Sequence, residues 1–403
     1  MRVNKAFVAA LAVCLYATGS PPFVFSMFMP FAVRVVLALG ALFCVGAFLV
    51  GRNANLPHLP VTLWLLLVSA MGLCSRNEIT SLVYSAVNIV FLFLVVEIAK
   101  NSHAFNGYLR RFWLWTWSIA SVSVIVVFLD FQVHWLPFSE VNLAEFLNND
   151  EAYRYYNNII FGNYVMYHFF DFTVPKSSWY IFEPGLLSFY LGMNFLLADQ
   201  FCECGRSCRI FKTLNLVAGL LTFSTTFYIF FIVYALYQLG TLRLLGKFRI
   251  LFVLLFPLEV MALGYNFVAN LDLISFTSAA DRSVRLDIAQ MIMSKNTVLS
   301  FLFGNGIGIS SVVADRGLSS GLLNIIIERG FLIFIFLMGL LYKYTKANRA
   351  LFIFILFNLL AIEMVWWPSL YLALALCYAS CKQCRPASET CVFMEHSLPV
   401  GSS

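Results

Sequence analysis

Long apolar runs separated by short polar connections recur along the whole chain. Most runs have about 15–25 residues, the length that an α-helix needs to cross the hydrocarbon layer of a bilayer. The pattern predicts an all-α integral membrane protein, a single polytopic domain over residues 1–403 with about twelve transmembrane helices. The predicted segments are 6–19, 33–50, 59–74, 79–99, 112–137, 180–199, 211–223, 226–239, 250–268, 321–342, 350–367 and 369–380.

The run from 211 to 239 has two interpretations, one tilted helix or two short helices. Basic residues flank it on both sides, and a single crossing would separate them across the membrane. A turn at Ser224-Thr225-Thr226 keeps both groups on one side, so the positive-inside rule favours the pair.

Two long polar excursions, at about 138–179 and 269–320, interrupt this regular alternation. Most basic residues outside them fall in short connections on one side of the predicted topology, and short connections are what the positive-inside rule weighs. We therefore expect both termini in the cytoplasm and both excursions on the far side. The residues assigned to the cytoplasm are Arg2, Lys5, Arg52, Lys100, Arg110, Arg111, Arg206, Arg209, Lys212, Arg243, Lys247, Arg249, Lys343, Lys346, Arg349, Lys382 and Arg385.

Composition agrees with a membrane protein. Apolar residues make up 61% of the chain, charged residues 11%, and the mean hydropathy is +0.84. The net charge of +6 follows from the positive-inside bias and gives no support for nucleic-acid binding. Neither excursion contains a cysteine, and the clustered cysteines elsewhere match no standard zinc spacing. We interpret the cysteines as reduced thiols, with no metal site.

The first excursion is rich in aromatic residues. Arg154, Tyr155 and Tyr156 lie together in its middle, and Lys176 and Trp179 lie near its end. An aromatic belt at the membrane surface is one interpretation. The other is a carbohydrate platform, because flat rings stack on the apolar faces of sugars while polar neighbours bind hydroxyl groups.

Glu183-Pro184 follows this excursion and opens the next apolar segment. Proline suits the first position of a helix, which places Glu183 at or near the N-cap. The carboxylate then serves either as a cap stabilised by the helix dipole or as a base that accepts a proton from a sugar hydroxyl.

The second excursion carries Arg282 and Arg285, which share one face if the segment is helical. They form either a surface helix with an Asp281–Arg285 pair or a guanidinium clamp on a diphosphate. A glycine-rich stretch follows at 303–308, which does not follow a strand and is no dinucleotide fingerprint. Glu328-Arg329 then lies inside the outer part of an apolar segment, where charges are costly unless they face the bundle interior.

Together these residues resemble the Wzy-type O-antigen polymerases of the O-antigen ligase and polymerase superfamily. Phe182-Glu183-Pro184 is similar to the family's Glu-Pro element. Arg282 and Arg285 with 303–308 resemble its arginine and "FGxGxG" stretch, and Glu328 with Gly330 matches its "E-x-G".

The chain also departs from the superfamily. Many relatives carry Ser-Arg at the outer turn where this chain has Ser224-Thr225-Thr226, and the basic residue nearest to Glu183 on its N-terminal side is Lys176. Ligases usually place a histidine between the glycine-rich stretch and the "E-x-G". This chain has Ser319-Ser320 in that region and no histidine from 169 to 395, which favours a polymerase over a ligase.

The resemblance implies a GT-C-like, inverting, metal-independent glycosyltransferase without a cofactor, in the inner membrane of a bacterium. Its substrates would be an undecaprenyl-diphosphate-linked glycan donor and acceptor, with membrane lipid and a chain-length regulator as further partners. Glu183, Arg282 and Arg285 would be catalytic. The expected substrate-binding residues are Arg154, Tyr155, Tyr156, Lys176, Trp179, Arg316 and Glu328. The alternatives are an O-antigen ligase acting on lipid A–core and a lipid-linked oligosaccharide flippase or transporter.

Overall fold

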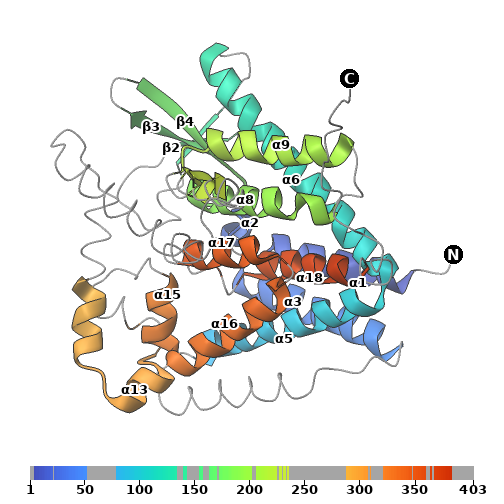
Figure 1. The fold of residues 1–403 in the computed structure, drawn as a ribbon, viewed down its shortest axis with the longest axis vertical. Helices are drawn as coiled ribbons and strands as arrows, with labels where there is room; N and C mark the ends of the chain where they lie inside the picture. Colours follow the sequence, from blue (N-terminus) through green and yellow to red (C-terminus); the bar gives the residue numbers. More distant parts are fainter. Residues whose placement is uncertain are drawn as a thin grey trace, which may run out of the picture.

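A computed structural model provides the fold, and most of the residues that it describes are helical (Figure 1). It describes residues 4–20, 22–51, 79–133, 139–142, 154–157, 163–169, 172–201, 206–224, 227–228, 230–232, 234–235, 287–306, 309, 321–346, 348–359, 364 and 367–383. The longer helices are α1 (Lys5–Thr18), α3 (Phe31–Val50), α5 (Ile79–Asn101), α6 (His103–Val133), α8 (Pro184–Phe201), α9 (Arg206–Leu221), α16 (Phe331–Thr345), α17 (Arg349–Leu359) and α18 (Pro368–Gln383).

Two of the described helices, α3 and α6, are long and apolar enough to cross a membrane by length and composition. Both carry large apolar side chains on their outer faces: Phe43 on α3 is 76% exposed and Trp115 on α6 is 71% exposed. Exposed apolar surface of this kind favours association with a membrane. The predicted segments 59–74 and 250–268 lie outside the described residues, and the full set of about twelve crossings stays a prediction.

The predominance of helices agrees with the all-α prediction, and the first excursion adds strands that the prediction did not include. These are β1 (Ser139–Asn142), β2 (Arg154–Asn157), β3 (Asn163–Phe169) and β4 (Phe172–Trp179). β1 pairs antiparallel with β2, and β3 pairs antiparallel with β4, with Tyr167 opposite Val174. Aromatic and β-branched residues favour strands. The preference of aromatic residues for strands therefore explains the richness of this loop in such residues, in addition to an aromatic belt or a carbohydrate platform.

One end of the helix bundle, which we call the basic end, gathers the helix termini that carry lysine and arginine. The Asn4 amide bonds the Tyr108 hydroxyl at 3.4 Å, joining the starts of α1 and α6. Tyr378 at the end of α18 packs on Tyr344 of α16 and lies under the Lys100 ammonium of α5. The basic residues at these termini are Lys5, Lys100, Arg110, Arg111, Arg206, Arg209, Lys212, Lys343, Lys346 and Arg349.

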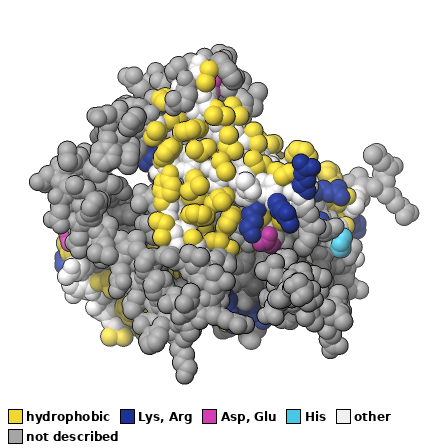
Figure 2. Space-filling view, turned by 45° about the horizontal axis from the view of Figure 1, so that its top comes forward, with side chains coloured by type: hydrophobic (Ala, Val, Ile, Leu, Met, Phe, Trp, Pro, Cys, Tyr) yellow, Lys and Arg dark blue, Asp and Glu magenta, His cyan; other side chains and the backbone are white. Residues whose placement is uncertain are grey.

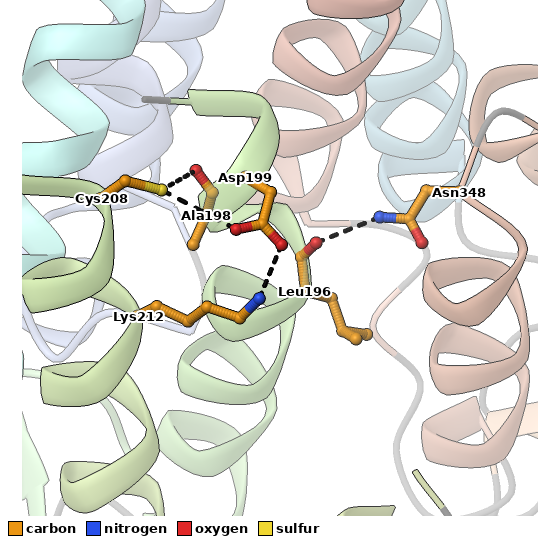
Figure 3. Close-up of polar contacts among 6 residues, drawn as sticks. All are labelled: Leu196, Ala198, Asp199, Cys208, Lys212 and Asn348. Atoms are coloured by element: carbon orange, nitrogen blue, oxygen red, sulfur yellow. Dashed lines mark hydrogen bonds and ion pairs between the residues drawn. The ribbon is translucent and has the colours of Figure 1, made fainter. Parts of the chain in front are cut away.

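Side chains from α9 and from the start of α17 hold the end of α8 at this basic end (Figure 3). The Cys208 thiol donates to the Ala198 carbonyl at 3.2 Å, and the Lys212 ammonium pairs with the Asp199 carboxylate at 2.6 Å. The Asn348 amide donates to the Leu196 carbonyl at 3.1 Å. The Ala198 carbonyl is among the last four of α8, which have no partners within the helix, and the other two contacts further fix the position of α8.

The opposite end, which we call the hairpin end, carries the β3–β4 hairpin. Here the Ser188 hydroxyl near the start of α8 donates to the Ser224 hydroxyl beyond α9 at 2.9 Å. Phe128 near the end of α6 packs on Phe223 at 6.0 Å. Figure 1 shows the hairpin, α13 (Val298–Phe303) and α15 (Gly321–Asn324) on the same side of the molecule, opposite the start of α1.

The chain reverses direction at Ser224, as the two-helix interpretation of 211–239 predicts. The Ser224 carbonyl accepts bonds from the N–H groups of Phe227 and Tyr228, which starts a new helical turn. Tyr234 then packs on Phe195 near the basic end of α8, at 5.3 Å. The described residues after Ser224 therefore lead back towards the basic end.

Candidate functional site

Glu183 lies where the hairpin passes into α8, and it caps that helix. The Glu183 carbonyl accepts bonds from the N–H groups of Leu186 and Leu187, each at 3.1 Å, and α8 begins at Pro184 as predicted. The residue is exposed. A carboxylate here is stabilised by the positive end of the helix dipole and remains accessible from outside the bundle.

A short extended segment after α1 holds the approach to Glu183 in place. The Val24 N–H donates to the Tyr180 carbonyl at 2.8 Å, and the Phe182 N–H donates to the Pro22 carbonyl at 3.1 Å. These bonds form an antiparallel bridge between Phe23 and Ile181. The residue before the helix cap is thus bound to a segment far away in the sequence.

Trp179 supports the hairpin from inside. Its side chain is only 7% exposed and packs on Phe23 of the bridge and on Trp117 of α6, with ring centroids 6.5 and 6.2 Å away. Its backbone has φ of +50°, an uncommon conformation for a residue with a large side chain. This burial favours a supporting role, and sugar stacking by Trp179 stays a prediction.

Lys176 lies on β4 and is partly buried. Burial penalises the charged ammonium and lowers the pKa of Lys176 to about 8. Tyr180, which stacks on Phe25 at 5.1 Å, has its pKa raised by burial. A lysine with this pKa is still protonated in part near neutral pH and suits an anionic ligand.

The glycine-rich stretch and the Glu328 segment bind each other directly. The Asn305 N–H and the Asn305 side-chain amide both donate to the Ile327 carbonyl, at 2.8 and 3.0 Å. The Gly306 N–H donates to the Glu328 carbonyl at 3.1 Å. We call this contact of Gly304–Gly306 with Ile327–Gly330 the glycine interlock.

Two glycines make the interlock possible. Gly304 has φ of +89° and Gly330 has φ of +87°. A Cβ on Gly304 would lie 2.3 Å from the Glu328 carbonyl oxygen, and one on Gly330 would lie 2.3 Å from the Leu302 carbonyl oxygen. Any side chain at either position would meet backbone, so both segments require glycine for this approach.

The interlock surrounds two buried charges at a break in a helix. Glu328 is 5% exposed and Arg329 is 7% exposed, within a π-helical turn, η2 (Ile325–Arg329), that ends at Gly330 before α16 begins. The predicted segment 321–342 is therefore interrupted. π-helical turns occur frequently at functional sites, and buried charges in apolar helices mark functional or structural pairing.

The described helix over residues 287–294 packs against this site. Its residues Ile288, Ala289 and Ile292 form a small apolar cluster with Ile327. Arg282 and Arg285 precede this helix in the sequence and lie outside the described residues, as does Arg316. Only the backbone of Arg154, Tyr155 and Tyr156 is described, on β2 opposite β1.

The structure thus brings some predicted residues together and leaves others apart. Glu328 joins the glycine-rich stretch, and Lys176, Trp179 and Glu183 share the hairpin base. Figure 1 shows the elements that carry or adjoin these groups on opposite sides of α17, with β4 and α8 on one side and α13 and α15 on the other. Sequence reasoning missed the part played by Asn305, although its place between two glycines was visible, and it missed the pairing of Pro22–Val24 with the hairpin base, which leaves no local signal.

Comparison with protein-family models, with curated proteins and with solved structures finds no match to this chain. Among the residues that the structure describes, no three or more histidine, cysteine, aspartate or glutamate side chains gather closely enough to hold a metal ion.

Proposed function

We propose that this protein is a polysaccharide polymerase of a bacterial inner membrane, which joins undecaprenyl-diphosphate-linked repeat units at the periplasmic face. The observation that carries the proposal is the glycine interlock. It binds two of the motifs that resemble the Wzy-type polymerases, the glycine-rich stretch and the "E-x-G", through backbone hydrogen bonds around Glu328 and Arg329.

Two further observations support the same proposal. The hairpin base and the interlock lie at one end of the bundle, and the basic helix termini lie at the other. The positive-inside rule then assigns the basic end to the cytoplasm and the hairpin end to the periplasm. Exposed apolar side chains on α3 and α6 fit a position in lipid.

The proposed reaction is an inverting glycosyl transfer. A hydroxyl oxygen of the acceptor repeat unit attacks the anomeric carbon of the donor, and the bond from that carbon to the diphosphate oxygen breaks. The Glu183 carboxylate accepts the hydroxyl proton, and undecaprenyl diphosphate leaves with the bonding electrons. Arg282, Arg285 and Lys176 stabilise the negative charge on the departing diphosphate.

Chain-length analysis of the glycan in cells tests this proposal. A deletion strain receives Glu183→Ala, Arg282→Ala or Arg285→Ala, and its lipopolysaccharide is separated on a gel. We expect loss of the ladder with a single repeat unit retained. Asp199→Ala and Arg349→Ala remove one carboxylate and one arginine at the basic end and serve as matched controls. Ladders of normal length in all three site variants, at normal membrane abundance, would contradict the proposal.

Purified protein separates the polymerase from the ligase. Labelled lipid-linked repeat units should give a ladder of lengthened lipid-linked products. Transfer only to lipid A–core would identify a ligase, and labelled lipid moved across the bilayer without a new glycosidic bond would identify a flippase.

A further inference from the structure

A group of arginines at the basic end has no role in the proposed reaction. Arg111 lies on α6, and Arg206 and Arg209 lie in the first turn of α9; all three are exposed. The helices α6 and α9 pack against each other. We call these three arginines the basic rim.

The basic rim borders an apolar surface on the same two helices. Trp115, Ile119 and Val122 continue the exposed face of α6 beyond Arg111, at spacings of three and four residues that keep them on one side of the helix. On α9, Ile210 and Val217 are exposed in the same way. Figure 2 looks onto the part of the molecule where α6 and α9 lie, and it shows a broad apolar surface with lysine and arginine gathered at one end.

Among the residues that the structure describes, no acidic side chain pairs with the rim. Within the described part of the chain, Asp199 pairs with Lys212 and Glu97 pairs with Lys100, whereas Arg111, Arg206 and Arg209 have no ion-pair partner. Three guanidinium groups therefore present unpaired donors directly beside apolar surface. Guanidinium groups bind phosphate through paired hydrogen bonds.

The order of side chains along α6 identifies the kind of ligand. Along the exposed face of α6, starting from the basic end of the bundle, an arginine is followed by a tryptophan and then by aliphatic residues. The rise from Arg111 to Trp115 is about 6 Å and from Arg111 to Val122 about 16 Å. Phosphate, glycerol and acyl chain follow one another over comparable depths in a phospholipid, and tryptophan prefers the boundary between them. A soluble polyanion would instead leave the tryptophan and the aliphatic residues in water.

We infer that the basic rim is a docking surface for anionic phospholipids of the cytoplasmic leaflet. Their headgroup phosphates bind Arg111, Arg206 and Arg209, and their acyl chains lie along Trp115, Ile119 and Val217. The inference rests on the membrane position proposed above but not on the glycosyl transfer. Lysine and arginine near an anionic membrane surface gain attraction in this way.

Quenching of Trp115 by brominated lipids tests the inference. The protein is placed in vesicles that contain equal fractions of brominated phosphatidylglycerol or brominated phosphatidylcholine. The difference in fluorescence between the wild type and Trp115→Phe isolates the signal of this residue. We expect at least about twofold stronger quenching by the anionic lipid, because its phosphate charge is not offset by a cationic group as it is in phosphatidylcholine.

Two triple variants make the result specific. Arg111→Gln with Arg206→Gln and Arg209→Gln should remove the preference while quenching by both lipids continues. Lys343→Gln with Lys346→Gln and Arg349→Gln removes the same charge from exposed positions on α16 and α17 and just after α16, and should keep the preference. Equal quenching by both lipids in the wild type overturns the docking surface and leaves the membrane position intact. If neither lipid quenches Trp115, both the docking surface and the membrane position are contradicted. A preference for the anionic lipid that survives in the rim variant also overturns the inference.

Discussion

Gly304 and Gly330 each have a positive φ, and each lies against the backbone of the other's segment. The restriction is mutual, because a Cβ on either residue meets atoms that have no freedom to move aside. The constraint at these two positions is therefore steric. The absence of a Cβ at both positions allows Glu328 and Arg329 to be held at the break before α16.

Gly330→Ala should destabilise the protein by about 3 kcal/mol or more, because it adds strain at positive φ to a backbone clash. We expect loss of the polysaccharide ladder and a lower midpoint of thermal unfolding in detergent. Gly339→Ala is the matched control inside α16, the helix that follows Gly330, since a Cβ there meets nothing within 4 Å and alanine favours the helix. Equal effects of the two substitutions would show that the interlock does not need glycine.

Lys176 gives a prediction about pH. Burial lowers its pKa from 10.5 to about 8, so between these values the unfolded chain binds the proton and the folded protein releases it. The free energy of unfolding therefore rises with pH across this window, while the native ammonium is lost. If the charge binds diphosphate, polymerisation in vitro should fall as the pH passes about 8.

Lys176→Arg tests the cause of this pH dependence. Arginine keeps its charge throughout the range, so activity should persist to higher pH than in the wild type. Identical pH profiles of the two proteins would show that the charge of Lys176 does not bind the diphosphate.

At the scale of elements, several helices begin and end where local chemistry predicts. Pro184 opens α8, and the chain turns at Ser224, because proline at a first position and a polar break in an apolar run are local signals. The break at Gly330 was not predictable in this way. Hydropathy continues across it from 321 to 342, and the need for positive φ arises only from contact with Gly304. The strands were missed because their aromatic residues also fit a membrane belt.

The end of α8 provides a prediction at this scale. The Asn348 amide donates to the Leu196 carbonyl, and its oxygen accepts a bond from the Leu351 N–H at 3.1 Å, so one side chain caps α17 and joins it to α8. Asn348→Ala should lower the free energy of unfolding by about 1–2 kcal/mol. Asn348→Asp keeps the cap of α17 and loses only the bond to α8. Thermal unfolding of both variants measures the two contributions, and no loss in either would show that neither bond stabilises the protein.

At the scale of the molecule, the helix termini divide into a basic end and a hairpin end, and the charge pattern of the sequence already predicts that division. Local patterns give no information on whether the hairpin base and the interlock share one substrate. β4 and α8 lie on one side of α17 in Figure 1, and α13 and α15 lie on the other. The candidate residues were therefore predictable as two separate groups. The position of one group relative to the other depends on packing between segments far apart in the sequence.

Reporter fusions test the orientation of the whole molecule. Alkaline phosphatase joined after Phe169 should be active, because β3 belongs to the hairpin end. Green fluorescent protein joined after Thr345 should fluoresce, because α16 ends at the basic end. Alkaline phosphatase becomes active only in the periplasm. Green fluorescent protein that is exported unfolded does not fluoresce, so its fluorescence marks the cytoplasm. The opposite pair of results would invert the proposed topology.

The bridge between Phe23 and Ile181 has a consequence for how the protein is made. Pro22–Val24 leaves the ribosome long before Tyr180–Phe182, so its backbone groups wait unpaired while the chain between the two segments is synthesised. The last approach to Glu183 therefore forms late in biogenesis and closes over an N-terminal part already in place. A chain divided within residues 52–78 should consequently recover its activity when both fragments are made together, with the N-terminal fragment acting as the template on which the hairpin base assembles.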